Sequence, residues 1–197
     1  MKRRIFIAIN LPEDVKNKLA ACRNEWADLP VRFTKKDSLH LTIVFIGYVA
    51  DEEMLDICQK VRGVAKENYP FSLRFSRICL GPPGKPPRLI WLEGEKNERL
   101  SRLKRKLEKV VFSKENELGD SVDEGGGDKK FLPHITLARI RQMEWKSLSE
   151  EEPVIDQKIS LDVPIGSIEV MESCLMRGGA EYIVLESAEL GKIGLAT

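Results

Sequence analysis

Two stretches decide the fold: Leu39–Gly47, LHLTIVFIG, and Phe131–Ile140, FLPHITLARI. Both are rich in β-branched and other apolar residues and therefore predict strands. Each stretch contains a histidine followed two places later by a threonine. The chain has only two histidines, His40 and His134, and both belong to this pattern of histidine, apolar residue, threonine and apolar residue. A single His-x-Thr is usually structural, but two matching copies that use every histidine point to a function.

The spacing of the pattern has a direct structural meaning. Residues i and i+2 of a strand lie on one face, and i+1 and i+3 lie on the other. Each motif therefore presents an imidazole and a hydroxyl together, His40 with Thr42 and His134 with Thr136, while the apolar residues anchor the strand in the core. Two such strands side by side would offer two imidazoles and two hydroxyls across one groove.

The segments around the two motifs follow the same plan. Residues 5–9 predict a buried strand and residues 12–29 an amphipathic helix before the first motif. The segment GPPGKPPR, residues 81–88, then breaks the pattern, because neither a helix nor a central strand accommodates it. Afterwards a strand (88–95), a helix (100–111), a glycine-rich loop (125–127) and the second motif repeat the order. We expect one α+β domain over residues 1–197, with pseudo-repeats of approximately 1–80 and 88–197.

Three further elements are expected outside this repeated plan. A helix begins near Asp51, which is suited to its N-cap, and a strand covers residues 71–75. Two tail strands, 167–176 and 181–187, are joined by a turn at Gly178 and Gly179.

Composition limits the function. The chain has 197 residues, with 32 Lys and Arg against 31 Asp and Glu, and this balance excludes a broad basic field for nucleic acid. No apolar run is long enough for a membrane span, and the run in MKRRIFIAIN is too short for a secretory signal. The four cysteines lie far apart, which favours buried, reduced thiols in a cytoplasmic protein.

The paired imidazoles and hydroxyls suit the cleavage of a phosphodiester. One neutral imidazole can take a proton from an attacking hydroxyl or water, and a protonated one can supply a proton to the leaving oxygen. The threonine hydroxyls can donate to the non-bridging phosphate oxygens. A zinc site is the alternative, but no acidic or cysteine ligand is suitably spaced as the third ligand, so we expect no metal and no cofactor.

The phrases HLTIVFIG, PRLIWLEG and FLPHITLAR resemble the RNA 2′,3′-cyclic phosphodiesterases, also called 2′-5′ RNA ligases, of the two-histidine phosphoesterase superfamily. The resemblance implies a bilobal fold in which two antiparallel sheets flank a central groove and the helices lie outside. It also implies metal-independent hydrolysis of RNA 2′,3′-cyclic phosphate ends to 2′-phosphates. By the resemblance, His40 is the proton donor to the leaving 3′ oxygen, His134 is the proton acceptor from water, and Thr42 and Thr136 hold the phosphate.

Three more residues are candidates for substrate binding. Arg139 follows the second motif where the family tends to carry a basic residue, but strict alternation from His134 puts it on the opposite face unless a bulge or strand end re-aims it. Phe45 stands at the corresponding place after His40 and would stack on a base or fill the core, of which the core is favoured. Arg88, after the proline-rich break, is a candidate phosphate contact.

Two alternatives stay open at this point. The first is a 2′-5′ RNA ligase that joins RNA halves carrying 2′,3′-cyclic phosphate and 5′-hydroxyl ends. The second is a non-catalytic RNA-binding module. The expected partner is RNA with a 2′,3′-cyclic phosphate terminus, with tRNA halves among the candidates, and the chain is expected to be a monomer. A near-zero net charge is compatible with an enzyme that grips one terminal phosphate and little more of the strand.

Overall fold

The structure is a computed structural model that describes residues 2–113, 131–148, 153–176 and 179–192. The elements up to the proline-rich break are β1 (Lys2–Asn10), α1 (Glu13–Ala21), β2 (Val31–Phe33), β3 (His40–Ala50), α2 (Asp51–Lys66) and β4 (Phe71–Gly81), with 3₁₀ turns at Cys22–Trp26 and Lys36–Ser38. The later elements are β5 (Leu89–Gly94), α3 (Glu98–Phe112), β6 (His134–Ile140), α4 (Gln142–Lys146), β7 (Asp156–Ile165), β8 (Ser167–Met176) and β9 (Gly179–Glu189).

The strands pair antiparallel in the order β7-β4-β5-β6-β3-β1-β8-β9, and β2 pairs with β6 beside this path. The predicted α+β class with antiparallel strands is confirmed. The expectation of two separate sheets is wrong, because β3 and β6 join both halves into one nine-stranded sheet. The junction is narrow: Leu41 opposite Ile135 is the paired position between these strands.

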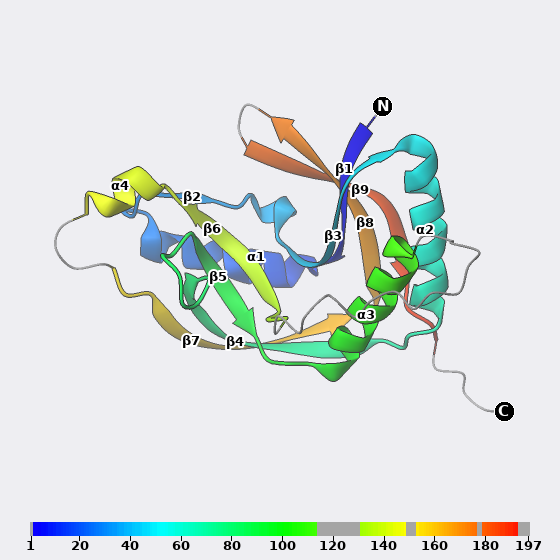
Figure 1. Ribbon diagram of the computed structural model, residues 1–197. Coiled ribbons are helices and arrows are strands. Elements are labelled where there is room, and N and C mark those ends of the chain that lie inside the picture. The colour runs from blue at the N-terminus through cyan, green and yellow to red at the C-terminus, as the bar shows by residue number, and fades with distance from the viewer. Residues whose placement is uncertain (1, 114–130, 149–152, 177–178, 193–197) are drawn as a thin grey trace.

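Helices α2 and α3 pack against the outside of the sheet, where they contact the central strand β3. Figure 1 shows α2 and α3 side by side at one end of the molecule, where they contact each other and β3, and α4 at the other end. The side chains of α3 that recur at steps of three and four, Leu100, Leu103 and Leu107, are buried, as the helical periodicity predicts. None of the helices in the described part of the chain is both long and apolar enough to cross a membrane.

The core is built from the anchoring residues of both motifs. Leu41 and Ile135 are at most 1% exposed, and Ile43 and Leu137 at most 3%. They lie in one hydrophobic cluster that runs through both halves of the sheet. Burial of these four side chains fixes which face of β3 and β6 carries the histidines, since alternate residues of a strand point to opposite faces.

Several boundaries differ from the sequence expectations. The helix predicted over residues 12–29 is α-helical only over Glu13–Ala21 and continues as a 3₁₀ turn that keeps Trp26 buried. The strand predicted over residues 71–75 extends to Gly81 as β4. The strands β2 and β7 were not expected; β7 carries charged residues that alternate with buried ones at the edge of the sheet. The tail strands pair as predicted, while Gly178 and residues 125–127 lie outside the described part.

Candidate active site

The two motifs lie on the neighbouring central strands β3 and β6. Leu41 pairs with Ile135, so His40 and Thr42 flank this position on β3, and His134 and Thr136 flank it on β6. All four polar side chains are half-buried on the face opposite the core. Each histidine is therefore the residue just before the paired position of its own strand, and the charge of His134 acts on His40. The structure therefore brings together the four residues proposed from the sequence for the chemistry.

Both imidazoles are held in the same orientation. The Nδ1 atom of His40 lies 2.8 Å from the carbonyl oxygen of Ser38, and that of His134 lies 2.9 Å from the carbonyl oxygen of Leu132. Because a carbonyl oxygen only accepts, Nδ1 carries the proton and donates in both rings. The other nitrogen, Nε2, is left for proton transfer; in His40 it is 3.1 Å from the Thr42 hydroxyl oxygen. Each motif thus fixes its own histidine tautomer through the carbonyl two residues earlier.

Each motif ends in a bulge, and the bulge in β6 explains the position of Arg139. In the β5–β6 ladder, Trp91 faces Thr136 and the next residue, Ile90, faces Ala138, so that Leu137 is an extra residue. The bulge reverses the alternation and turns Arg139 toward the histidine face. Its side chain lines a cavity next to the Ser38 carbonyl that orients His40. Of the two interpretations left open by the sequence, the bulge is the one observed.

A bulge of the same kind in β3 changes the direction of the Phe45 side chain. Ala8 faces Thr42 and Ile7 faces Val44 in the β1–β3 ladder, so Ile43 is the extra residue. Phe45 is 72% exposed, and its ring centroid lies 6.3 Å from that of Phe6. The preference for a core position is therefore wrong, because the bulge sends the side chain to the face that carries His40.

The structure adds an aromatic layer that the sequence reasoning missed. The rings of Phe6 and Tyr182 lie 5.1 and 4.8 Å from His40, centroid to centroid, and Trp91 lies 4.3 Å from His134. The Trp91 indole donates through Nε1 to the Sγ atom of Cys79, 3.2 Å away. Phe6 and Trp91 occur in predicted strands, but continuous apolar runs do not reveal which face of a strand each residue occupies.

Burial shifts the titration of both histidines in the same direction. Desolvation lowers the pKa of His40, and the charges of Lys16, Arg139 and His134 lower it further, while the Ser38 carbonyl raises it. Desolvation also lowers the pKa of His134, but the Leu132 carbonyl and the charge of Glu93 raise it. Both imidazoles are therefore biased toward the neutral form, and only His134 has an acidic group acting against this bias.

A small, positively charged cavity of about 40 Å³ lies beside Arg139, on the face that carries the histidines. Its basic lining comes from Arg32, Lys35 and Arg139, and Lys35 also pairs with Glu181 at 2.5 Å. The remaining lining residues are Phe33, Thr34, Ser38, Ala180 and Tyr182. Arg88 is exposed just before β5 and does not line this cavity. The cavity can accept an anionic group, and the structure brings Arg139 but not Arg88 to it.

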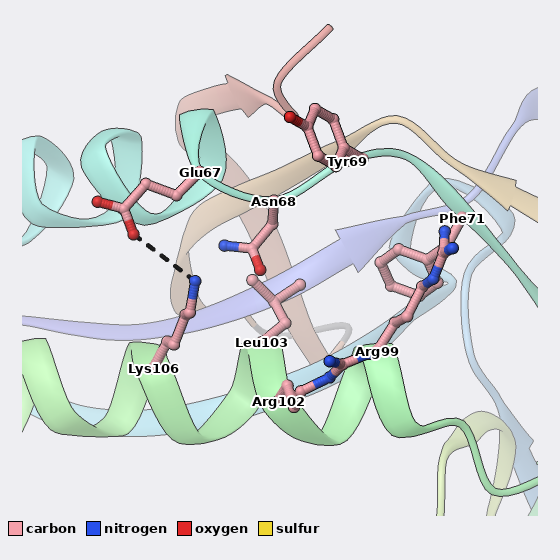
Figure 2. A pocket seen from close by; sticks show the side chains of 8 residues that line it. All are labelled: Glu67, Asn68, Tyr69, Phe71, Arg99, Arg102, Leu103 and Lys106. Atoms are coloured by element: carbon pink, nitrogen blue, oxygen red, sulfur yellow. Dashed lines mark ion pairs between the residues drawn. The ribbon is translucent and has the colours of Figure 1, made fainter. Parts of the chain in front are cut away.

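A larger cavity of about 350 Å³ lies between α3 and the segment that follows α2, away from the histidines (Figure 2). Arg99, Arg102 and Lys106 point into it from α3, and Lys106 pairs with Glu67 at 3.6 Å. Neither histidine nor threonine of the motifs lines this cavity. The larger of these two cavities therefore lacks the groups for acid–base chemistry, since proton transfer requires groups that titrate near neutral pH.

Within the described residues, no three His, Cys, Asp or Glu side chains are grouped so that they could hold a metal ion. The four cysteines are free; Cys58 and Cys79 are buried, and Cys22 and Cys174 are half-buried.

Comparison with known proteins connects this geometry to a family. A family model described as LigT like Phosphoesterase matches residues 9–91. An RNA 2′,3′-cyclic phosphodiesterase of Thermus thermophilus is 30% identical over 194 residues, which cover 95% of this chain and 90% of the relative.

Solved structures agree with the sequence comparison. A crystal structure of a Thermus thermophilus protein has a TM-score of 0.77 and 29% identity, covering 96% of this chain and 99% of its own. The fold is also that of Escherichia coli LigT, solved with ATP, which has a TM-score of 0.71 and 22% identity and covers 98% of this chain and 100% of its own. The chain therefore belongs to the LigT-like phosphoesterases, in the family of RNA 2′,3′-cyclic phosphodiesterases.

Proposed function

We propose that the chain hydrolyses 2′,3′-cyclic phosphate ends of RNA to 2′-phosphates without a metal ion. The observation that carries the proposal is the placement of two oriented imidazoles, each with a threonine two residues later, on either side of the Leu41–Ile135 pair that joins β3 and β6. A phosphate bound between the two imidazoles has one of them on each side, as an in-line displacement requires.

In the proposed reaction, Nε2 of His134 takes a proton from water while the water oxygen attacks phosphorus. The bond from phosphorus to the 3′ oxygen breaks, and Nε2 of His40 gives its proton to that oxygen. Thr42 and Thr136 donate to the non-bridging oxygens, where negative charge builds up in the transition state. His40 must be protonated for this role, and a bound phosphate anion favours that form against the effect of burial.

The structure supports binding roles for two of the three further candidates. Arg139 lines the basic cavity beside His40 and is proposed to contact phosphate. Phe45 is exposed on the same face, where its ring can stack on a base. Arg88 stays a proposal without a contact to support it.

We further propose that residues 1–197 act as one bilobal domain, as a monomer and in the cytoplasm, with tRNA halves among the substrates. Both motifs and their supporting residues come from a single chain, so the site needs no second copy. Four free thiols fit a reducing compartment.

The test uses a short RNA that ends in 2′,3′-cyclic phosphate, with excess chelator, and separates 2′- from 3′-phosphate products. We expect a 2′-phosphate and a loss of at least about 10²-fold in turnover for His40→Ala and for His134→Ala. Undiminished turnover in either variant would refute the proposed mechanism. Binding without turnover would instead identify a non-catalytic RNA-binding module.

A second arm of the test addresses ligation. Adding RNA with a 5′-hydroxyl lets that hydroxyl take the place of water in the same displacement, which would create a 2′-5′ linkage. A junction that forms faster than hydrolysis would make ligation the principal activity.

A further inference from the structure

The two motifs occupy equivalent positions in their ladders but have different neighbours. On the outer side of each motif strand, Thr42 faces Ala8 and Thr136 faces Trp91. Two pairs further along, His40 faces Asn10, whereas His134 faces Glu93. The position beside the imidazole therefore holds a neutral amide in one motif and a carboxylate in the other.

Glu93 is well placed to act on His134. Residues directly opposite each other in an antiparallel pair point to the same face, with Cβ atoms about 4.5–5.5 Å apart. Glu93 is half-buried, and its Oε2 atom lies 3.8 Å from Sγ of Cys79, the same sulfur that accepts the Trp91 indole N–H. Cys79 and Trp91 thus pack the carboxylate and the imidazole of His134 into one layer.

The charges around His134 leave Glu93 as its acidic neighbour. From β3, His40 faces the same groove and carries no negative charge. From β4, Arg77 stands opposite Glu93, but its guanidinium pairs with Asp156 on β7 at 2.6 Å. Among the charges that act on His134, Glu93 is the one that favours its protonated form.

The surroundings of His40 have the opposite sign. The cations of Lys16 on α1 and Arg139 on β6 act on it. The Oδ1 atom of Asn10 is buried and makes no hydrogen bond within the part of the chain that the structure describes. On β8, the carboxylate of Glu169 accepts from the Asn10 backbone N–H and from two serine hydroxyls instead of reaching His40.

We propose that Glu93 is a positioning residue that makes the groove asymmetric: its carboxylate stabilises the imidazolium that His134 becomes when it takes the proton of the attacking water. Glu93 does not take that proton itself. Asn10 at the equivalent position gives His40 no such partner, which leaves His40 free to release its proton to the 3′ oxygen. This inference rests on the proposed acid–base function of the two histidines.

The experiment compares Glu93→Gln with Glu95→Gln, which removes a carboxylate from an exposed position two residues along the chain. Two measurements are made on each variant: the imidazole titrations by NMR without substrate, and the pH profile of turnover on cyclic-phosphate RNA. The chain has two histidines, so the spectrum contains two imidazole signals, which His40→Gln assigns.

For Glu93→Gln we expect the His134 titration to move to lower pH, while that of His40 stays within the change seen for Glu95→Gln. The acid limb of the pH profile, set by the base, should move the same way. Turnover on the plateau should fall about two- to fivefold, up to about 1 kcal/mol at 1.36 kcal/mol per factor of ten.

Three results would overturn the inference, and they are distinguishable. An unmoved His134 titration means that Glu93 does not act on the imidazole, whatever the enzyme does. A moved titration with a shifted alkaline limb means that His134 is the acid. A moved titration with full turnover in His134→Ala means that the proposed function itself has failed.

Discussion

Replacing Gly81 by alanine should damage the site through Trp91. A Cβ atom built at Gly81 would lie 2.5 Å from Cδ2 and Cε2 of the Trp91 indole and 2.8 Å from Cε3. The indole cannot easily yield, because it is 5% exposed, donates to Cys79 and lies 4.3 Å from the His134 ring. The displacement that a methyl group at Gly81 causes is therefore passed through Trp91 to His134.

The size of the effect follows from the overlap. Carbon atoms prefer separations of about 3.5–4.0 Å, so the indole must move by roughly 1 Å. Overpacking of this kind costs about 1–3 kcal/mol, and each kcal/mol lowers the Tm of a chain of this size by about 2–4 °C. A displacement near 1 Å in a catalytic group can cost up to about a hundredfold, so we expect turnover to fall roughly ten- to hundredfold.

Gly63→Ala is the matched control, since the chemical change is identical. Gly63 lies within α2, and apart from the neighbouring backbone of that helix no atom stands within 4 Å of a Cβ built there. Alanine should stabilise the helix by about 0.5–1 kcal/mol and leave turnover unchanged. Thermal melting and steady-state kinetics on cyclic-phosphate RNA measure both variants. A Gly81→Ala protein that melts with the wild type and keeps its turnover would refute the chain of contacts from Gly81 to His134.

Two further predictions concern binding and pH. Arg139→Ala should raise KM for a cyclic-phosphate dinucleotide roughly tenfold, because one charged hydrogen bond is lost. Arg102→Ala in the larger cavity should leave KM unchanged. Equal KM changes in the two variants would contradict the assignment of the site. Burial lowers the pKa of both imidazoles below the ordinary value of 6.5. The unfolded chain therefore binds more protons than the folded one, and the free energy of unfolding falls as the pH drops from the unfolded-state pKa toward the folded-state pKa values. Urea midpoints at about pH 7.5 and about pH 5.5 should therefore differ less for the double variant His40→Gln/His134→Gln than for the wild type, and an equal difference would count against this linkage.

The larger cavity shows why position and chemistry must be weighed together. Its three basic residues suit an anion by charge alone; Figure 2 shows Lys106 turned toward Glu67 and Arg99 turned toward Phe71. Neither of the two histidines of the chain lines it. The smaller cavity beside Arg139 is lined by Ser38, whose carbonyl orients His40.

Local sequence patterns were sufficient for the central part of the fold and of the candidate site. The period-two alternation around His40 and His134 predicted the strands, the anchoring faces and the pairing of each imidazole with a threonine, because these properties depend on residues one or two places apart. The proline-rich break between residues 81 and 88 was also predicted from the sequence, since proline restricts the backbone wherever it stands. These features needed no contact between distant segments.

Tertiary structure decided what depends on the partner strand. The bulges after Thr42 and Thr136 arise from the registers against β1 and β5, and they turn Phe45 and Arg139 toward the groove. The single sheet, the edge strand β7 and the aromatic rings against the histidines likewise depend on pairings across many residues. The sequence determined which groups would carry the chemistry, because strand alternation is local. The fold decided the neighbours of these groups, including Glu93 beside His134, because register is set between strands far apart in the chain.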